Sequence, residues 1–300
     1  MDIWKLLLRY LSDMNCRSVA LLLLFVSCSK ESTKNGDALI PSIAPAICDY
    51  EQKEVEMKAT GWLKVFEDNF ESDLSQWNVW TGGAYNEELQ HYQASNLEVA
   101  NGTLLINAKK ESVTGNTTPQ DPTQKSFGFT SGRIESKTNI SANPNAPKVR
   151  IAARIKLPSG KGLWPAFWSY GDPWPTQGEI DFLEARGNEP TKYQTNYFFG
   201  TSTNNNLVKG AEHVIETDAN LTTCYHVYEL IWEESKLTSI LDGTVVEVKA
   251  SGGYIPQLFG KQQRVTLNVA VGGWFFNNLD PSTIEEGTMM VDWVRVYTSN

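Results

Sequence analysis

Hydrophobic and polar positions alternate in short runs along most of the chain beyond residue 61. In residues 148–157 (KVRIAARIKL), outward cations alternate with inward apolar side chains, which is the period of a half-buried strand. In residues 237–250, the pair Asp242-Gly243 separates two apolar runs, which is a hairpin signal. Further runs of this kind cover residues 103–110, 264–273 and 289–297. No window has a helical period longer than two turns, so the pattern predicts an all-β sandwich or barrel with antiparallel pairing.

The N-terminus carries the pattern of an export signal. Residues 18–27 form a short apolar run, which Arg17 precedes and Cys28 follows. This run is shorter than the roughly 20 apolar residues that span a bilayer, and its basic flank is typical of a secretory signal. The stretch FVSC resembles a bacterial lipobox, which implies a signal peptide over residues 1–28 and lipidation of Cys28. A plain secretory signal with an ordinary thiol at Cys28 is the alternative, and Met14 is an alternative start.

Length and composition describe one large acidic domain with an appendage. The polar stretch after Cys28 predicts a tether or linker over residues 29–60. The formal charge of the chain is -9, and removing residues 1–28, which carry a net +1, changes it to -10. With no basic cluster, the chain has nothing to attract a phosphate backbone, so we expect no nucleic-acid partner. The 10 Trp and 11 Tyr include more flat faces for sugar stacking than most chains offer.

The cysteines and histidines add little chemistry. Cys48 and Cys224 are the cysteines that remain after residue 28. Export would permit a disulfide between them, but the sequence does not show whether their Cα atoms approach closely enough, so the pairing is left open. The three histidines, His91, His213 and His226, are widely spaced with no cysteine in metal spacing, which argues against a catalytic zinc site.

The most informative stretch is GEIDFLEARG, residues 178–187. In a regular strand Glu179 and Asp181 would share one face, while Glu184 would point into the apolar layer at a high cost. A one-residue bulge near Phe182 would return Glu184 to the face of the other two carboxylates. Paired carboxyls about 5–5.5 Å apart are what a retaining glycosidase needs. A solvated acidic edge strand is the alternative, but the aromatic run 164–168 just upstream favours a sugar-binding site.

These residues stand within a longer resemblance. The chain is similar to glycoside hydrolase family 16, in particular its laminarinase-like branch with the bulged signature E-x-D-x-x-E, over residues 61–298 in the expected order. The matching segments are NEELQHY (86–92), SGRI (131–134), ARIKLPSGKGLWPAFW (153–168), GEIDFLE (178–184), YHVYELIW (225–232), LDG (241–243), LNVAVGG (267–273) and VDWVRVY (291–297). The resemblance implies a β-jelly roll of two curved antiparallel sheets with a concave substrate cleft.

The same resemblance implies roles for individual residues. Glu179 would be the nucleophile, Glu184 the general acid and base, and Asp181 would orient Glu179 and influence its protonation. Residues implied to line or support the cleft are Trp164, Trp168, Glu88, Arg133, Asn196 and Trp274. Asn196 stands where the family usually has a histidine, and Trp274 begins the run WFF where it usually has Asn-Trp-Pro. These departures affect the expected substrate more than the expected chemistry.

The resemblance also implies a structural Ca²⁺, while no cofactor is expected for catalysis. Its ligands would be the side chain of Asp292 and the backbone carbonyls of Gly102 and Asn69, since calcium prefers hard oxygen donors. A carboxylate of Asp292 that pairs with Arg295 or caps a turn is the alternative.

Three functions follow as hypotheses. The first is a retaining endo-β-1,3(4)-glucanase acting on laminarin or mixed-linkage glucan. The second keeps the chemistry but cuts a β-galactoside polymer, such as galactan, poly-N-acetyllactosamine or mucin O-glycans. The third is a surface glycan-binding lipoprotein without turnover, which the three mutually repelling carboxylates argue against. In each case we expect a monomer in the cell envelope, held at the outer membrane through a lipid anchor only.

Overall fold

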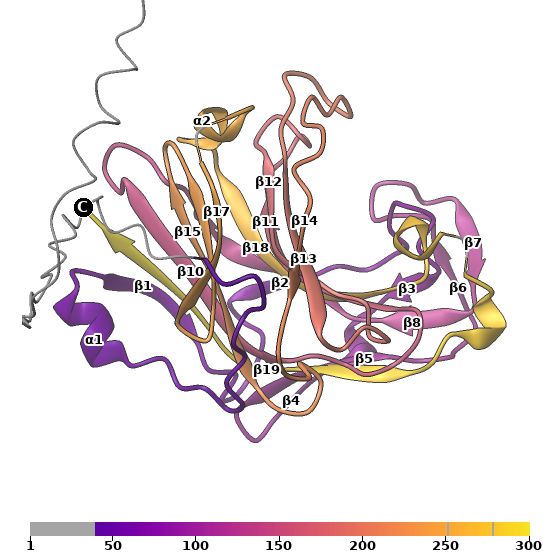
Figure 1. The fold of residues 1–300 in the computed structure, drawn as a ribbon. Helices are drawn as coiled ribbons and strands as arrows, with labels where there is room; N and C mark the ends of the chain where they lie inside the picture. Colours follow the sequence, from indigo (N-terminus) through magenta and orange to yellow (C-terminus); the bar gives the residue numbers. More distant parts are fainter. Residues whose placement is uncertain (1–39, 251, 278) are drawn as a thin grey trace, which may run out of the picture. The chain divides into compact units, whose positions relative to one another are not determined.

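The computed structural model describes residues 40–250, 252–277 and 279–300, which fold into two antiparallel sheets packed face to face. The eight-stranded sheet (Figure 1) contains β17 (Thr244–Lys249), β16 (Leu237–Leu241), β15 (His226–Glu233), β10 (Lys148–Lys156), β19 (Gly287–Ser299), β5 (Thr103–Ala108) and β4 (Leu97–Ala100), in this order, with β1 (Leu63–Asp68) also paired to β19. The predicted fold class is therefore confirmed.

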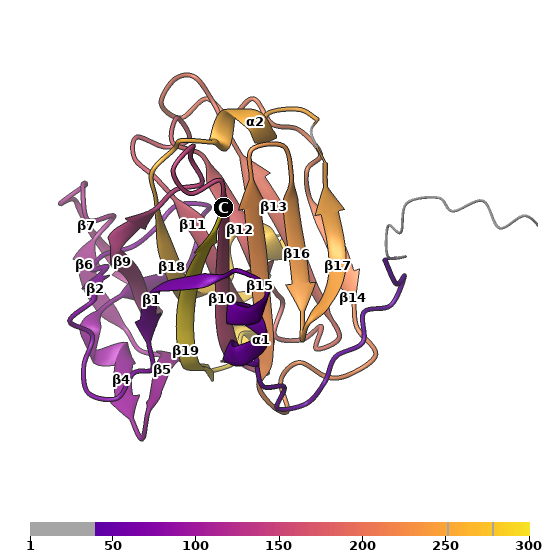
Figure 2. The same ribbon diagram turned by 90° about the vertical axis from the view of Figure 1, so that its left-hand side faces the viewer.

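The seven-stranded sheet carries the sequence stretch of greatest interest. Its order is β14 (His213–Glu216), β13 (Lys192–Phe198), β12 (Glu179–Glu184), β11 (Leu163–Tyr170), β18 (Gln263–Val271), β9 (Arg133–Ile140) and β2 (Trp77–Val79). Figure 2 shows β10, β15, β16 and β17 side by side in the other sheet, with β12 and β13 behind them. The carboxylate strand thus lies inside a sheet, with a hydrogen-bonded strand on each side.

Shorter elements complete the domain. The parallel pair of β3 (Gln90–Tyr92) and β8 (Phe129–Ser131) and the hairpin of β6 (Val113–Asn116) and β7 (Gln124–Phe127) lie beyond one end of the large sheets (Figure 1). The helices are short, as the sequence pattern predicts: α1 (Glu54–Ala59), α2 (Ile255–Leu258) and the 3₁₀ turns η2 (Ala94–Asn96), η3 (Trp274–Phe276) and η4 (Pro281–Thr283).

The core lies between the two sheets and fixes which side chains face outward. Phe167 on β11 and Phe182 on β12 are both buried and meet edge to face, with 4.8 Å between their ring centroids. Because successive residues of a strand point to opposite sides, burying Phe167 directs its neighbours Ala166 and Trp168 to the other face. That outer face of the seven-stranded sheet is called the active-site face below.

Two hairpins have the turn chemistry that their sequences demand. Asp242 and Gly243 join β16 to β17 with φ values of 47° and 80°, which confirms the predicted hairpin. Asn101 and Gly102 join β4 to β5 in the same way, with φ values of 52° and 71°. Two-residue loops need positive φ at both positions to match the strand twist, and Asn-Gly and Asp-Gly are the pairs that adopt it most easily.

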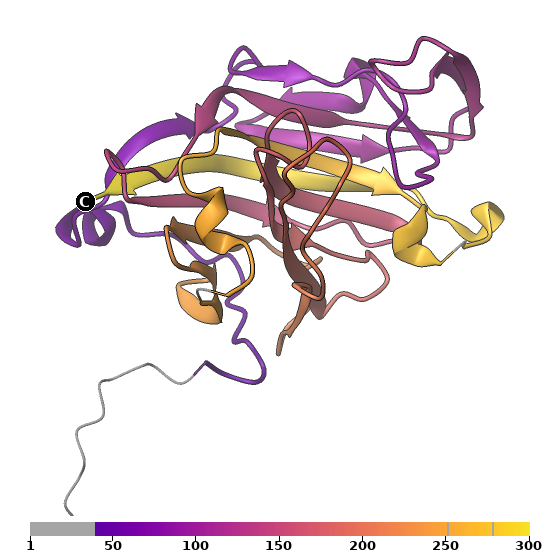
Figure 3. The ribbon, with the colours of Figure 1, turned by 90° about the horizontal axis from the view of Figure 1, so that it is seen from above.

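Residues 40–60 do not form the predicted linker. This segment, which includes α1, lies along the domain (Figure 3): Tyr50 packs on β10, β15 and β19 of the eight-stranded sheet, and the compact unit begins at Ile40. Ala44 is buried and bridges to Thr217, while the buried amide of Gln52 donates to the carboxylate of Glu229. The domain boundary predicted at residue 61 is therefore wrong. Residues 40–60 belong to the domain because side chains such as Ala44 and Gln52 are buried against it.

A disulfide holds the same segment. Cys48 and Cys224 are bonded, with their Cα atoms 5.5 Å apart, across a sequence separation of 176 residues. The bond joins the N-terminal segment to the residues that lead into β15, and it decides the pairing that the sequence left open. The predicted signal peptide and Cys28 lie outside the described residues. Among the residues that are described, no helix is long and apolar enough to cross a membrane.

Candidate active site

The three carboxylates of β12 lie on one face because the strand pairing shifts. On β11, Glu179 pairs with Tyr170 and Asp181 with Trp168, but Glu184 pairs with Ala166 after a register shift. The pairing with β13 shifts between Asp181 and Glu184 as well. Directly paired residues point to the same side of a sheet, so all three carboxyls stand on the active-site face. Phe182 and Leu183 are both buried in the core.

Each glutamate accepts a hydrogen bond from one tryptophan. The indole Nε1 of Trp174 donates to Oε2 of Glu179 over 2.9 Å. The indole Nε1 of Trp164 donates to Oε1 of Glu184 over 3.0 Å. Asp181 lies between them with 4% of its surface exposed, and its Oδ2 has no hydrogen-bond partner among the described residues. The two glutamates are thus held from opposite ends of the strand by indole donors.

Burial and mutual repulsion make these carboxyls weak acids. Burial, followed by the charge of Glu184, raises the pKa of Glu179 to about 8. Burial raises the pKa of Glu184 to about 7, although hydrogen bonds from Gln194 and Trp164 oppose the rise. Burial and the two glutamates raise the pKa of Asp181 well above its ordinary value. Since the three groups titrate together, the cluster retains protons at neutral pH while one carboxyl can ionise.

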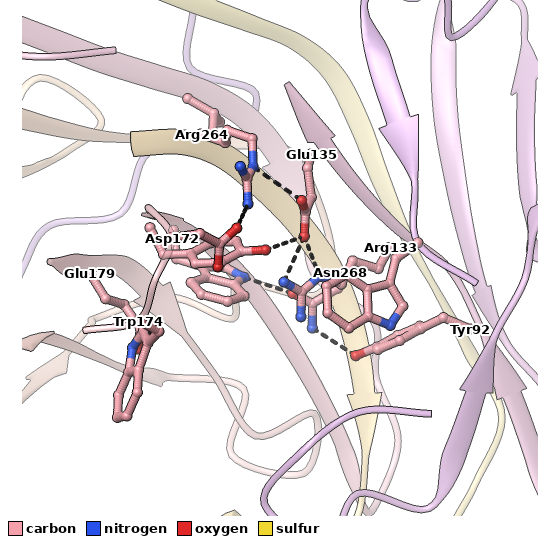
Figure 4. A network of polar contacts seen from close by, with 12 residues as sticks. Tyr92, Arg133, Glu135, Asp172, Trp174, Glu179, Arg264 and Asn268 are labelled. Atoms are coloured by element: carbon pink, nitrogen blue, oxygen red, sulfur yellow. Dashed lines mark hydrogen bonds and ion pairs between the residues drawn. The ribbon is translucent and has the colours of Figure 1, made fainter. Parts of the chain in front are cut away.

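Arg133 belongs to a chain of alternating charges beside the carboxylates (Figure 4). Its Nη2 donates to Oε1 of Glu135 over 2.7 Å, and Arg264 contacts the other oxygen of Glu135 over 3.2 Å. The Arg133 guanidinium also lies over the rings of Trp80 and Trp168, 4.0 Å and 4.8 Å from their centroids. Since Arg133 is buried and neutralised by Glu135, its cation is fixed in place against the rings of Trp80 and Trp168. These two rings are called the aromatic wall below.

A second set of hydrogen bonds links Trp168 of the aromatic wall to Glu88. Trp168 donates from its indole to Oδ1 of Asn268 over 2.7 Å, and Asn268 donates to the hydroxyl of Tyr92 over 3.1 Å (Figure 4). Glu88 is 8% exposed and accepts hydrogen bonds from Gln90 and Tyr92. Glu88 is therefore linked to Trp168 through Tyr92 and Asn268, and burial raises the pKa of its carboxyl.

The last two predicted residues occupy different settings. Asn196 pairs with Asp181 across β12 and β13 and is half-buried, so it adjoins the carboxylates. Trp274 is 61% exposed, and its backbone N–H donates to the carbonyl of Asn86 over 2.9 Å. The same loop also brings Phe275 onto Trp164, a contact that sequence reasoning missed although the run WFF was visible.

Other contributors gave weaker signals in the sequence. Trp174 was visible only as one more aromatic near the carboxylates, and Trp80 lies more than 50 residues upstream of Arg133 in the chain. Arg186 follows Glu184 by two residues, yet its partner Phe275 is 89 residues away. Partners this distant in sequence are set by strand order, which no local pattern encodes.

Of the three residues expected to bind calcium, Asn69 and Gly102 lie near each other. A Cβ added at Gly102 would lie 3.9 Å from the carbonyl oxygen of Asn69 and 3.9 Å from a carboxylate oxygen of Glu71. The Oδ2 of Asp292, however, pairs with the guanidinium of Arg154 over 2.8 Å, not with Arg295. Within the described residues, no group of three or more His, Cys, Asp or Glu is placed to hold a metal ion. The oxygen donors suit calcium, but Arg154 already supplies a positive charge at Asp292.

Comparison with known proteins gives the family. The model for glycosyl hydrolases family 16 matches residues 85–295. The chain belongs to glycosyl hydrolase family 16. This family 16 domain includes the whole of β12, Trp168 with Arg133, and the loop that carries Trp274, while Trp80 lies just before it.

Relatives and solved structures agree with this assignment. The chain is 33% identical over 267 residues to glucan endo-1,3-beta-glucosidase A1 of Niallia circulans, covering 79% of this chain and 38% of the relative. It is 31% identical over 267 residues to the glucan endo-1,3-beta-glucosidase of Cryptopygus antarcticus, covering 80% of this chain and 93% of the relative. The X-ray structure of the endo-beta-1,3-glucanase from Pyrococcus furiosus superimposes with a TM-score of 0.67 at 30% identity, covering 80% and 95% of the two chains. The chain thus spans 38% of the length of the Niallia protein but 93% of the length of the Cryptopygus protein.

Proposed function

We propose that this protein is a retaining, endo-acting β-glucanase that hydrolyses internal linkages of laminarin-like or mixed-linkage glucan. The observation that carries the proposal is the set of three carboxyls on one face of β12, with each glutamate held by an indole N–H. The names of the Niallia, Cryptopygus and Pyrococcus relatives support glucan as the substrate. The bulged form of the E-x-D-x-x-E signature is part of this proposal, supported by the register shifts on both sides of the strand.

The two glutamates divide the chemistry. Glu179 attacks the anomeric carbon and forms a glycosyl-enzyme, while Glu184 protonates the departing oxygen. Glu184 then takes a proton from water, which attacks the same carbon and releases the sugar with its configuration retained. The raised pKa values of Glu179, about 8, and Glu184, about 7, belong to one cluster that shares protons, and the reactive form is the one in which Glu184 holds the proton and Glu179 is ionised. Trp174 stabilises the ionised form of Glu179, because its N–H donates to the oxygen that becomes negative.

Asp181 has a supporting role in this proposal. Its carboxyl is buried between two others, and burial with their charges raises its pKa strongly. A protonated Asp181 adds no negative charge to the site, and its hydroxyl can orient the neighbouring Glu179 by hydrogen bonding. Trp168, with Arg133 beside it, offers a flat, cation-supported face for sugar rings.

A glycan panel tests the proposal. Protein beginning at residue 29, so that Cys28 and its lipid are absent, is incubated with laminarin, mixed-linkage glucan, agarose and mucin O-glycans, and products are read by mass spectrometry. Oligomers of glucose support the glucanase. Galactose-ended oligomers would instead indicate that Asn196 and Trp274 belong to a rebuilt donor pocket for a β-galactoside polymer.

Glu179→Gln is the matched control for turnover. We expect it to abolish product formation and to retain glycan affinity, because glutamine keeps the size of the side chain and an acceptor for Trp174. Product formation by Glu179→Gln would contradict the nucleophile, and affinity without turnover in the unmodified protein would favour a glycan-binding protein. Proton NMR of the first product distinguishes retention from inversion.

We also propose that the protein is exported and anchored at the outer membrane through Cys28. The apolar run before Cys28 supports this placement, and the Cys48–Cys224 disulfide is in keeping with an oxidising compartment. Any bound Ca²⁺ would be structural and held by Asn69, Gly102 and Asp292, and Asp292 would have to exchange its ion pair with Arg154 for the metal.

A further inference from the structure

Three aromatic and cationic groups from separate segments are packed together beside Glu184. Phe275, in η3, stacks on Trp164 of β11 with 4.3 Å between the ring centroids and 10° between the ring planes. The guanidinium carbon of Arg186 lies 3.9 Å from the centroid of Phe275. The Nε and Nη2 atoms of Arg186 also donate to the carbonyl oxygen of Phe275, over 3.2 Å and 2.9 Å. This arrangement is called the Arg186–Phe275–Trp164 stack.

The stack restrains the indole ring of Trp164. A ring packed in parallel against Phe275 cannot tilt without losing that contact. Phe275 is in turn held at its backbone by two hydrogen bonds and at its ring by a cation. The covered face of Trp164 is also closed to a sugar ring. These contacts make Trp164 better suited to holding another protein group than to binding substrate by stacking.

The group that Trp164 holds is the carboxyl of Glu184. Its indole Nε1 lies 3.0 Å from Oε1, whereas the amide of Gln194 lies 3.5 Å from Oε2. The stronger hydrogen bond at Oε1 favours this oxygen as the unprotonated, carbonyl oxygen of the carboxyl. The proton that Glu184 transfers then resides on Oε2. A general acid works only when its proton lies within hydrogen-bond reach of the leaving oxygen, so fixing Oε1 also fixes where the proton is presented.

Several charged groups surround Glu184 and set its ionisation. Arg186 favours the ionised form of Glu184 and Glu212 disfavours it. The charge of Glu184 in turn helps to raise the pKa values of Glu179 and Asp181. On the side of β13, Gln194 donates weakly to Oε2 over 3.5 Å. A cavity of about 160 Å³ adjoins Glu184 on this side and is also lined by Arg186, Glu189 and Lys192. Lys192 is paired with Glu216 over 2.8 Å, and Arg186 lies 3.9 Å from a carboxylate oxygen of Glu189. Of the described cations, Arg186 is the one whose charge lowers the pKa of Glu184.

We propose that the Arg186–Phe275–Trp164 stack positions Glu184 as the general acid, by holding the indole N–H on Oε1 and directing the proton on Oε2 toward the leaving oxygen. Phe275 and Arg186 are positioning residues, since they act on Glu184 through Trp164. This inference rests on the proposed function of Glu184.

The test compares two leaving groups. Glycosidic oxygens of a polysaccharide need protonation as they depart, whereas a dinitrophenolate leaves without it. For Phe275→Ala we expect kcat/KM on the polysaccharide to fall by about 10- to 100-fold, because misplacement of a catalytic group by about 1 Å has that effect. On the dinitrophenyl glycoside of the same oligosaccharide, we expect the rate of glycosyl-enzyme formation to stay within about threefold of the unmodified protein.

The pH profile gives an independent reading. Both the Trp164 hydrogen bond and the Arg186 cation favour the ionised form of Glu184, so losing them raises its pKa. The basic limb of kcat/KM therefore moves to higher pH in Phe275→Ala and also in Arg186→Met, which removes both the cation and its hydrogen bonds to Phe275. Phe275→Tyr keeps the ring and is expected to keep the profile and both rates. Urea unfolding of each variant verifies that the domain remains folded at the assay temperature.

Each outcome decides the proposal. A loss confined to the polysaccharide, with a displaced basic limb, supports the stack as a positioning device. Equal losses on both substrates would overturn it in favour of substrate binding, and an unmoved basic limb in both variants would overturn it as well. If the unmodified protein cleaves neither substrate while remaining folded, the proposed function fails and this inference fails with it. Cleavage by the unmodified protein with unimpaired Phe275→Ala overturns the inference alone.

Discussion

Replacing Glu179 by glutamine changes how the stability of the domain depends on pH. Burial, followed by the charge of Glu184, raises the pKa of Glu179 in the folded protein from 4.5 to about 8. In the unfolded chain the same carboxyl ionises near its ordinary value. Between these two values the folded state binds more protons than the unfolded state, so the contribution of Glu179 to stability falls as pH rises. Glutamine has no charge to lose, and it still accepts the hydrogen bond from Trp174.

The size of the effect follows from the pKa difference. Each pKa unit corresponds to about 1.4 kcal/mol, so full ionisation of Glu179 costs the folded state roughly 5 kcal/mol. Because Asp181 and Glu184 share protons with Glu179, only part of this cost falls on the replaced group. We therefore expect Glu179→Gln to be more stable than the unmodified protein by about 2–5 kcal/mol at about pH 9, and by less than about 1 kcal/mol near pH 4.5.

Urea unfolding followed by circular dichroism at several pH values measures this difference, with the disulfide kept oxidised. Glu98→Gln is the matched control, because Glu98 is an exposed glutamate on β4 in the other sheet. Its unfolding free energy is expected to follow that of the unmodified protein at every pH. If the gain of Glu179→Gln is the same at about pH 5 and about pH 9, the carboxyl is not a weak acid in the folded state and the reasoning is refuted.

Two further substitutions test other parts of the structure. Trp174→Phe removes the donor to Glu179, so the pKa of that carboxyl rises and the acidic limb of kcat/KM is expected to move up by about one pH unit; an acidic limb that stays in place would contradict this role. Asp242→Ala removes a buried carboxylate that accepts hydrogen bonds from Val227, Ile47 and His226, at a position with φ of 47°. We expect a loss of about 3–5 kcal/mol in the free energy of unfolding, and a much smaller loss for Asp242→Asn, which keeps the turn-forming pair with Gly243.

Local sequence was sufficient for the strands, the turns and the clustering of three carboxyls on one face of β12. Alternating side chains in residues 148–157 predicted β10, because a strand with one buried face repeats every two residues. Asp242-Gly243 predicted the β16–β17 hairpin, since that pair adopts positive φ easily. The three acidic positions of residues 179–184 predicted a bulge, because burying Glu184 in the core would cost more than an irregular pairing.

Local sequence did not predict how distant segments meet. The polar stretch after Cys28 predicted a linker over residues 29–60, yet Gln52 is buried against Glu229, which is 177 residues away. The polar surroundings of Gln52 depend on β15 and β19 lying on either side of β10, which is a property of strand order. The Cys48–Cys224 disulfide has the same origin.

The local sequence of this protein therefore determined the cluster of three carboxyls, while the tertiary structure decided which distant side chains hold them. Glu179, Asp181 and Glu184 lie within six residues, so backbone geometry alone can bring them to one face. Phe275 reaches Trp164 only because β18 pairs with β11 and ends at the loop that carries η3. Local periodicity records which face a side chain occupies but not which strand lies beside it, and that neighbour is chosen by the packing of the whole core.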